Sequence, residues 1–328
     1  MTKDSCRSEG SRKRTMRKVV FGFCFVFAIC ALIPITSLVA QGTETSSPIK
    51  SFKVEVSGRG PAMILIPGLG SSGDVWKSTV AHYSGLYQCH VLTLAGFAGQ
   101  PPLPSMLLST QFLGRVRDDL ARYIRENKLE KPVIVGHSLG GLLALELAAE
   151  HPEIPGRLII VDSVPAFGAV ENPTISPEEL RDSAANMRDR MNAMPEDAFT
   201  HTQHSRIATM ATDPKDVETI YAWGKASDRT TMTEAMYELL STDLRDDVAR
   251  ITSPTLVLGT WIAQSKNMEQ ADVRQSFIAQ YQKLKGVRIE IAPTARHFIM
   301  FDDPQWMFSQ MDAFLPPAKA PAPPKKAN

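Results

Sequence analysis

A serine at the centre of a glycine-rich segment has the surroundings that nucleophilic chemistry needs. Residues 131–141 read KPVIVGHSLGG, which places Ser138 between Gly136 and Gly140. The apolar residues before it favour a buried strand, and the strong helix formers from Leu142 onward favour a helix. Glycines allow a sharp turn between them, so the hydroxyl is pushed outward above a helix N-terminus that favours negative charge. This G-x-S-x-G pattern predicts a nucleophile elbow with Ser138 as the nucleophile.

Strand-like and helix-like segments alternate on both sides of this motif. Short apolar or alternating runs predict strands at residues 52–56, 62–67, 90–94, 131–135, 157–161, 255–258 and 287–291. Apolar spacing of three or four residues, together with strong helix formers, predicts helices at residues 112–124, 142–150, 272–284 and 304–314. The alternation predicts the α/β class, with a mainly parallel sheet flanked by helices.

A largely helical segment at about residues 164–250 interrupts the alternation. Ser176, followed by Pro177 and two glutamates, has the features of a helix start. We therefore expect an inserted helical cap here. Its methionine and aromatic side chains either form the interior of the cap or face a substrate.

The N-terminus has the parts of an export signal. Basic side chains between residues 12 and 18 precede an apolar run at 19–33, and the small residue Ala40 stands before a polar stretch. This order predicts a secretory signal peptide over residues 1–40 and therefore an exported protein, periplasmic or secreted. The alternative is association with the membrane through an uncleaved anchor, since residues 19–40 are long enough to span a bilayer.

Composition excludes several other classes of protein. Seven of the 36 basic and two of the 35 acidic side chains lie in residues 1–40, so the rest of the chain is mildly acidic and lacks a basic surplus for nucleic acid. Of four cysteines only Cys89 lies beyond this region, and we expect it to be a small buried residue entering a strand.

No metal-ligand spacing, dinucleotide fingerprint or P-loop occurs, so no metal or cofactor is expected. The polar residues 41–50 suggest a linker, and the Pro-, Ala- and Lys-rich residues 316–328 suggest a disordered tail.

These features together resemble the α/β-hydrolase superfamily over about residues 50–315. The turn at 66–70 (IPGLG) looks like the oxyanion turn after an early strand, although Pro67 stands where many relatives carry His. The segment 295–300 (ARHFIM) looks like the histidine loop. The resemblance implies one hydrolase domain over residues 51–315 that contains the cap insertion.

The resemblance also implies a function for each site residue. A serine hydroxyl is a weak nucleophile and needs a base, which His297 in the histidine loop would supply to Ser138. The backbone amides of Leu69 and Leu139 are implied as the oxyanion hole. His137, inside the motif, is expected to support the elbow rather than to act as the base.

The acid of the catalytic triad is where the sequence departs from the common pattern. Many relatives carry an aspartate just after the strand that follows the cap, but residues 256–264 (LVLGTWIAQ) contain no carboxylate. Some members place the acid at the end of the strand before the cap, which here implies Asp162. The alternatives are Asp243, Glu269 or Asp272, or a weakened dyad.

A serine at the elbow favours acyl transfer to water. The sequence therefore predicts hydrolysis of a small-molecule carboxylic ester, or of a lactone or thioester, through an acyl-enzyme. Two alternatives remain open at this stage. One is a hydrolase-fold protein that binds a ligand with little turnover, and the other is a Ser-dependent C–C bond hydrolase.

Overall fold

The computed structural model describes residues 51–104, 111–262, 265–266 and 268–316. The predicted signal peptide or anchor, the predicted linker at 41–50 and all but the first residue of the predicted tail lie outside the described residues. Within the described ranges, no helix combines the length and the apolar character that a membrane crossing requires.

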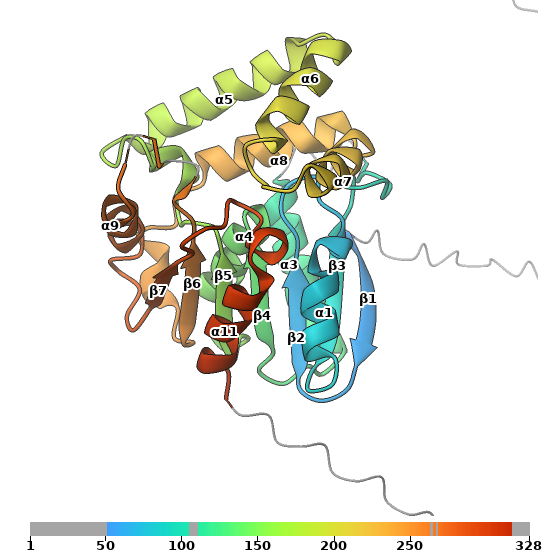
Figure 1. Ribbon diagram of the computed structural model, residues 1–328, viewed down its shortest axis with the longest axis vertical. Coiled ribbons are helices and arrows are strands. Elements are labelled where there is room, and N and C mark those ends of the chain that lie inside the picture. Colours follow the sequence, from blue (N-terminus) through green and yellow to red (C-terminus); the bar gives the residue numbers. More distant parts are fainter. Residues whose placement is uncertain (1–50, 105–110, 263–264, 267, 317–328) are drawn as a thin grey trace, which may run out of the picture. The chain divides into compact units, whose positions relative to one another are not determined.

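Seven strands form one sheet, in the order β1-β3-β2-β4-β5-β6-β7 (Figure 1). They are β1 (Phe52–Gly58), β2 (Ala62–Ile66), β3 (Gln88–Leu94), β4 (Val133–His137), β5 (Arg157–Val161), β6 (Thr255–Gly259) and β7 (Arg288–Ile291). β1 pairs antiparallel with β3, and every other neighbouring pair is parallel. The predicted α/β class with a mainly parallel sheet is confirmed.

Helices cover both faces of this sheet (Figure 1). One face packs against α3 (Phe112–Glu126), α4 (Leu139–Glu150) and α9 (Gln270–Gln280). The other packs against the 3-10 helix η1 (Gly73–Trp76), α1 (Lys77–Tyr83), the short α10 (Ile299–Asp302) and α11 (Pro304–Phe314). Because successive strand side chains point to opposite faces, Ile64 joins the first apolar core and Met63 joins the second.

Helix α4 begins three residues earlier than its sequence predicts. The low helix propensity of Gly140 and Gly141 favours a start at Leu142, yet the helix begins at Leu139. A Cβ on Gly141 would lie 2.5 Å from the Cβ of Ser163, so the absence of a side chain lets the first turn pack closely. Tertiary packing therefore overrides local propensity here.

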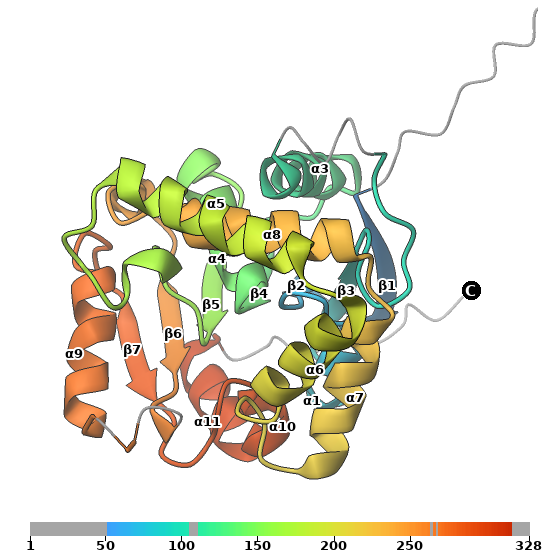
Figure 2. The ribbon, with the colours of Figure 1, turned by 90° about the horizontal axis from the view of Figure 1, so that it is seen from above.

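Four helices lie between β5 and β6 in the chain (Figures 1 and 2). They are α5 (Pro177–Ala193), α6 (Glu196–Ile207), α7 (Pro214–Lys225) and α8 (Arg229–Ser241), with the 3-10 helices η2 (Phe167–Ala169) and η3 (Asp247–Arg250) before and after them. α5 begins at the predicted position, where Ser176 and Glu179 form a capping box. The delimitation of a cap at about 164–250 stays a prediction. Among its methionine and aromatic side chains, Phe199, Met232 and Met236 are buried and Met187 is exposed.

Cys89 is fully buried in β3. Burial raises the pKa of its thiol to about 11, so the sulfur stays protonated at neutral pH and is not a reactive thiolate.

Candidate active site

Ser138 lies in the turn between β4 and α4 with a backbone conformation that serine rarely adopts. Its φ is 53° and its ψ is −120°. Its N–H donates to Val161 O at 3.0 Å, and its carbonyl accepts from the amides of Gly141 and Leu142 at 2.8 and 3.1 Å. These bonds on both sides of the residue hold the strained turn in place, as is typical of a functional site.

Close approach of three backbone segments explains the glycines around Ser138. A Cβ on Gly136 would lie 2.2 Å from Gly140 O, and a Cβ on Gly140 would lie 2.5 Å from Ile66 O and from Pro67 O. Real Cβ atoms do not come this close to backbone oxygens. The ends of β2 and β4 can therefore meet the start of α4 only where side chains are absent.

His297 and Asp162 meet at the carboxyl edge of the sheet. His297 lies between β7 and α10, and Asp162 directly follows β5. His297 Nδ1 lies 2.6 Å from Asp162 Oδ2, and the two side chains are only 19% and 12% exposed. Asp162 also accepts two hydrogen bonds from Thr260, through the backbone N–H at 2.9 Å and through Oγ1 at 3.0 Å.

The other carboxylates considered from the sequence have different surroundings. Asp243 pairs with the guanidinium of Arg245 at 2.6 and 2.9 Å. Glu269 immediately precedes α9, and Asp272 lies in its first turn. In the described part of the chain, none of the three forms a hydrogen bond with His297, whereas Asp162 does.

His137 packs the histidine loop against the elbow. The side chain is fully buried, and its Nε2 lies 3.0 Å from His297 O. Burial, reinforced by the nearby His297, holds the pKa of His137 well below its usual value, so the ring is neutral and donates through Nε2–H. The rings of His137 and His297 lie 4.6 Å apart, which places the imidazole of His297 against the residue preceding Ser138.

The two predicted oxyanion donors lie on two different segments next to the elbow, Leu139 at the start of α4 and Leu69 in the turn after β2. Leu139 is the first residue of α4, so its amide has no acceptor within the helix. Leu69 follows Gly68 in the turn after β2, and a Cβ on Gly68 would lie 3.2 Å from the Cβ of Ser138. No hydrogen bond joins Ser138 Oγ to His297 Nε2 in this structure, a contact that in this class of site often tightens only when substrate is bound.

Thr260 is a site residue that the sequence pattern does not reveal. The lack of a carboxylate at 256–264 does not indicate that this segment supplies a hydrogen-bond donor to the site. The available signal is the position of Thr260. It directly follows β6, which pairs with β5, the strand that Asp162 directly follows.

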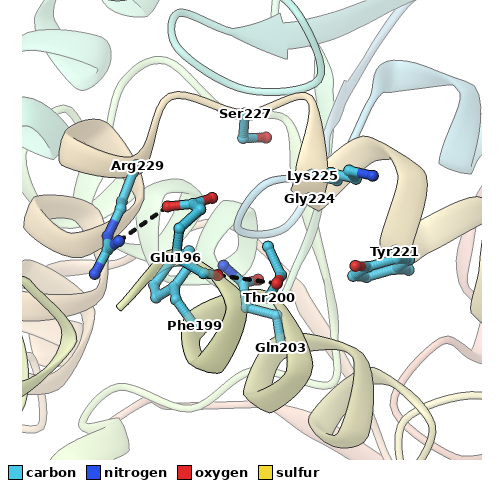
Figure 3. Close-up of a pocket in the computed structure, with 9 residues that line it drawn as sticks. All are labelled: Glu196, Phe199, Thr200, Gln203, Tyr221, Gly224, Lys225, Ser227 and Arg229. Carbon is cyan, nitrogen blue, oxygen red and sulfur yellow. Dashed lines mark hydrogen bonds and ion pairs between the residues drawn. The ribbon is translucent and has the colours of Figure 1, made fainter. Parts of the chain in front are cut away.

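A separate small pocket lies between α6 and α7 and is lined by polar side chains together with Phe199 (Figure 3). Arg229 at its edge pairs with Glu196 at 3.0 Å. None of the predicted catalytic residues lines it, although Ser227 on its wall lies 3.3 Å from Gly70 O in the turn after β2. No group of three His, Cys, Asp or Glu side chains suited to a metal ion occurs among the residues that the structure describes.

Comparison with known proteins places the chain in a family. Residues 63–310 match the model of the Alpha/beta hydrolase family, and the chain belongs to that family. It is 26% identical over 273 residues to the pimeloyl-[acyl-carrier protein] methyl ester esterase of Aeromonas hydrophila. The aligned region covers 81% of this chain and 99% of the relative. It is 29% identical over 214 residues to the protein of the same name from Aeromonas salmonicida, covering 63% and 78%.

Solved structures share the fold at lower identity. The esterase EaEST from Exiguobacterium antarcticum has a TM-score of 0.65 at 16% identity, covering 80% of this chain and 94% of its own. The enol-lactonase from Burkholderia xenovorans LB400 has a TM-score of 0.61 at 17% identity, covering 80% and 95%. The predicted α/β-hydrolase resemblance is thus confirmed, and the chain is an esterase-like hydrolase of this family.

Proposed function

We propose that this chain hydrolyses a carboxylic ester through an acyl-enzyme on Ser138, with His297 as general base and Asp162 as the acid of the triad. The observation that carries the proposal is the 2.6 Å contact between His297 Nδ1 and Asp162 Oδ2. It lies beside a serine held at an elbow with φ of 53°. A histidine oriented by a largely buried carboxylate next to a strained turn of this kind is the arrangement that activates a serine.

The reaction follows from these positions. Ser138 Oγ attacks the ester carbonyl while His297 Nε2 takes up its proton, and the amides of Leu69 and Leu139 stabilise the oxyanion. Asp162 holds the Nδ1–H tautomer and stabilises the imidazolium. The proton then passes to the leaving alcohol, which departs. Water attacks the acyl-enzyme with His297 again as base, which releases the carboxylic acid and restores the serine.

The names of the relatives support an ester as substrate. The two relatives described above, at 26% and 29% identity, are both named pimeloyl-[acyl-carrier protein] methyl ester esterase. A lactone or thioester would react through the same steps. The contact of Asp162 with His297 argues against a protein that only binds ligands, because such a protein has no need of an oriented base.

We also propose that the protein is exported, on the strength of the basic and then apolar residues at the N-terminus. Residues 19–40 would mediate membrane association if the segment were retained.

Hydrolysis of p-nitrophenyl acetate by the purified chain tests the catalytic proposal. We expect Ser138→Ala to lose at least about 10⁴-fold in kcat, and Asp162→Asn to lose about 10³- to 10⁴-fold because the wrong tautomer is favoured. Ser205→Ala, at an exposed position on α6, is the matched control and should retain wild-type activity. Equal turnover by the wild type and Ser138→Ala would show that Ser138 is not the nucleophile.

A further inference from the structure

Thr260 is a buried threonine that lies directly against the carboxylate of Asp162. It follows β6, and Asp162 follows the neighbouring parallel strand β5. The register pairs Val161 with Leu258, and the amide of Asp162 donates to Leu258 O at 2.7 Å. The two strand ends therefore lie side by side, and the side chain of residue 260 reaches the carboxylate.

The hydrogen bonds on this carboxylate show what Thr260 contributes. Oδ1 accepts from the Thr260 N–H at 2.9 Å. Oδ2 accepts from Thr260 Oγ1 at 3.0 Å and is also the atom 2.6 Å from His297 Nδ1. Thr260 is only 4% exposed, so water competes little for these bonds. Within the described residues its hydroxyl has no other acceptor, and its hydrogen therefore points at Oδ2.

The backbone of Asp162 has an uncommon conformation. Its φ is 45°, in the left-handed region that residues with a Cβ seldom occupy. Ser163 follows Asp162 in the chain, and its carbonyl accepts from Oη of Tyr281, directly after α9, at 2.8 Å. This bond fixes the residue next to Asp162. Nothing but Thr260 and His297 bonds to the carboxylate itself among the residues that the structure describes.

We infer that Thr260 is a positioning residue that holds the Asp162 carboxylate against Nδ1 of His297. The inference rests on the proposed function, since Asp162 is the proposed acid of the triad. Loss of the hydroxyl should let the carboxylate rotate away from Nδ1.

Among the described residues, the other groups beside His297 form no hydrogen bond with Thr260. The neutral His137 packs on the ring from β4. Arg296, the preceding residue, directs its guanidinium to Ala208 O and Ala211 O at 3.2 and 3.0 Å. A change in the environment of His297 Nδ1–H on replacing Thr260 can therefore be assigned to the Asp162 carboxylate.

Three variants of the full chain test the inference. Thr260→Val keeps the shape and removes the hydroxyl, Thr260→Ser keeps the hydroxyl, and Thr255→Val removes a buried hydroxyl from β6, the strand that Thr260 follows. Thr255 is 1% exposed and its Oγ1 donates to Ser253 O at 3.0 Å, so it is a matched control for lost stability.

We expect Thr260→Val to lower kcat about 10- to 100-fold with little change in KM, because the loss acts on the transition state. Thr260→Ser and Thr255→Val should stay within about threefold of wild type.

The Nδ1–H proton resonance of His297, observed by NMR in a Ser138→Ala background, gives a readout that does not depend on turnover. We expect Thr260→Val to move this resonance, because the carboxylate that accepts from Nδ1–H is displaced, and Thr255→Val to leave it unchanged. Equal kcat and an equal Nδ1–H resonance in these two variants would overturn the inference even in an active esterase. If serine-dependent ester hydrolysis is absent while the Nδ1–H resonance still moves in Thr260→Val, the proposed function fails but the positioning of Asp162 stands.

Discussion

At the scale of single residues, the elbow is a place where backbone atoms meet without side chains between them. Gly140 is the clearest case, because its Cα faces the last carbonyls of β2 and the following turn. The strained φ of Ser138 depends on this close approach. The same contact brings the turn that carries Leu69 beside the serine.

Gly140→Ala is expected to destabilise the protein by about 2 kcal/mol, since overpacking outweighs the better helix propensity of alanine. Its Cβ would lie 2.5 Å from Ile66 O and Pro67 O, and neither backbone oxygen can move without shifting β2. Urea unfolding measures the change. Gly85→Ala is the control, because a Cβ there meets no atom within 4 Å. Identical unfolding midpoints for the two variants would contradict the close approach.

At the scale of elements, the inserted helices are bonded to the loops on both sides of the site. The amide of Phe298, next to His297, donates to Met210 O just before α7 at 3.2 Å. Just after α7, Ala226 O accepts from Gly99 N at 3.0 Å, and the amide of Asp228 donates to Gly96 O at 2.7 Å. Helix α7 is thus held at both ends by contacts with the loops that follow β3 and β7.

Helix α8 is joined to α3 through a carboxylate. Glu238 Oε1 and Oε2 accept from the amides of Phe112 and Leu113 at 2.5 and 2.8 Å, which caps the N-terminus of α3 from another element. Burial raises the pKa of Glu238 to about 7, although the two amide bonds lower it, and Glu146 and Glu234 raise it further. The cap is therefore formed by a side chain that changes charge near neutral pH.

The raised pKa of Glu238 predicts a dependence of stability on pH. The folded pKa of about 7 lies above the ordinary value of 4.5, so the folded state binds the proton more tightly than the unfolded state. This contribution to stability is present below about pH 4.5 and is lost as pH rises toward 7. Glu238→Gln cannot ionise. The wild type should therefore lose up to about 3 kcal/mol relative to this variant between pH 4.5 and 7.

Urea unfolding at several pH values measures that difference. The difference in unfolding free energy between each variant and the wild type isolates the contribution of Glu238. Other buried groups contribute equally to both proteins; for example, the lowered pKa of His137 makes the free energy of unfolding rise with pH. Glu126→Gln, at an exposed position at the end of α3, is the control. Parallel curves for the wild type and Glu238→Gln would rule out the shifted pKa.

At the scale of the whole molecule, export would leave a chain that depends on its apolar cores. Cys6, Cys24 and Cys30 lie in the predicted signal peptide, and Cys89 is buried in β3. A mature chain with this one cysteine has no disulfide within itself. Stability must then come from the two apolar cores on either face of the sheet.

Cell fractionation with mass analysis of the N-terminus tests the export proposal. We expect a periplasmic or secreted chain that begins at Gln41, because the predicted cleavage follows the small residue Ala40. An uncut chain in the membrane fraction would favour the anchor instead. An uncut chain in the cytosol would contradict both.

The sequence by itself determined the features whose causes are local. Apolar runs predicted the strand Arg157–Val161 and the helix Pro304–Phe314 with the bounds that the structure has. The elbow was predictable because its strand, glycines and helix are contiguous, and the family followed from that motif and its order among the other turns.

Tertiary structure alone decided which carboxylate meets His297 and what supports it. Asp162 and His297 are 135 residues apart, and Thr260 is 98 residues from Asp162. Their contacts depend on the order and register of β5, β6 and β7. The hydrophobic pattern within a single strand does not encode that order or register. The same holds for Glu238, 126 residues from the helix that it caps. Residues that act across neighbouring strand ends or between helices are brought together by packing, and their sequence spacing carries no trace of it.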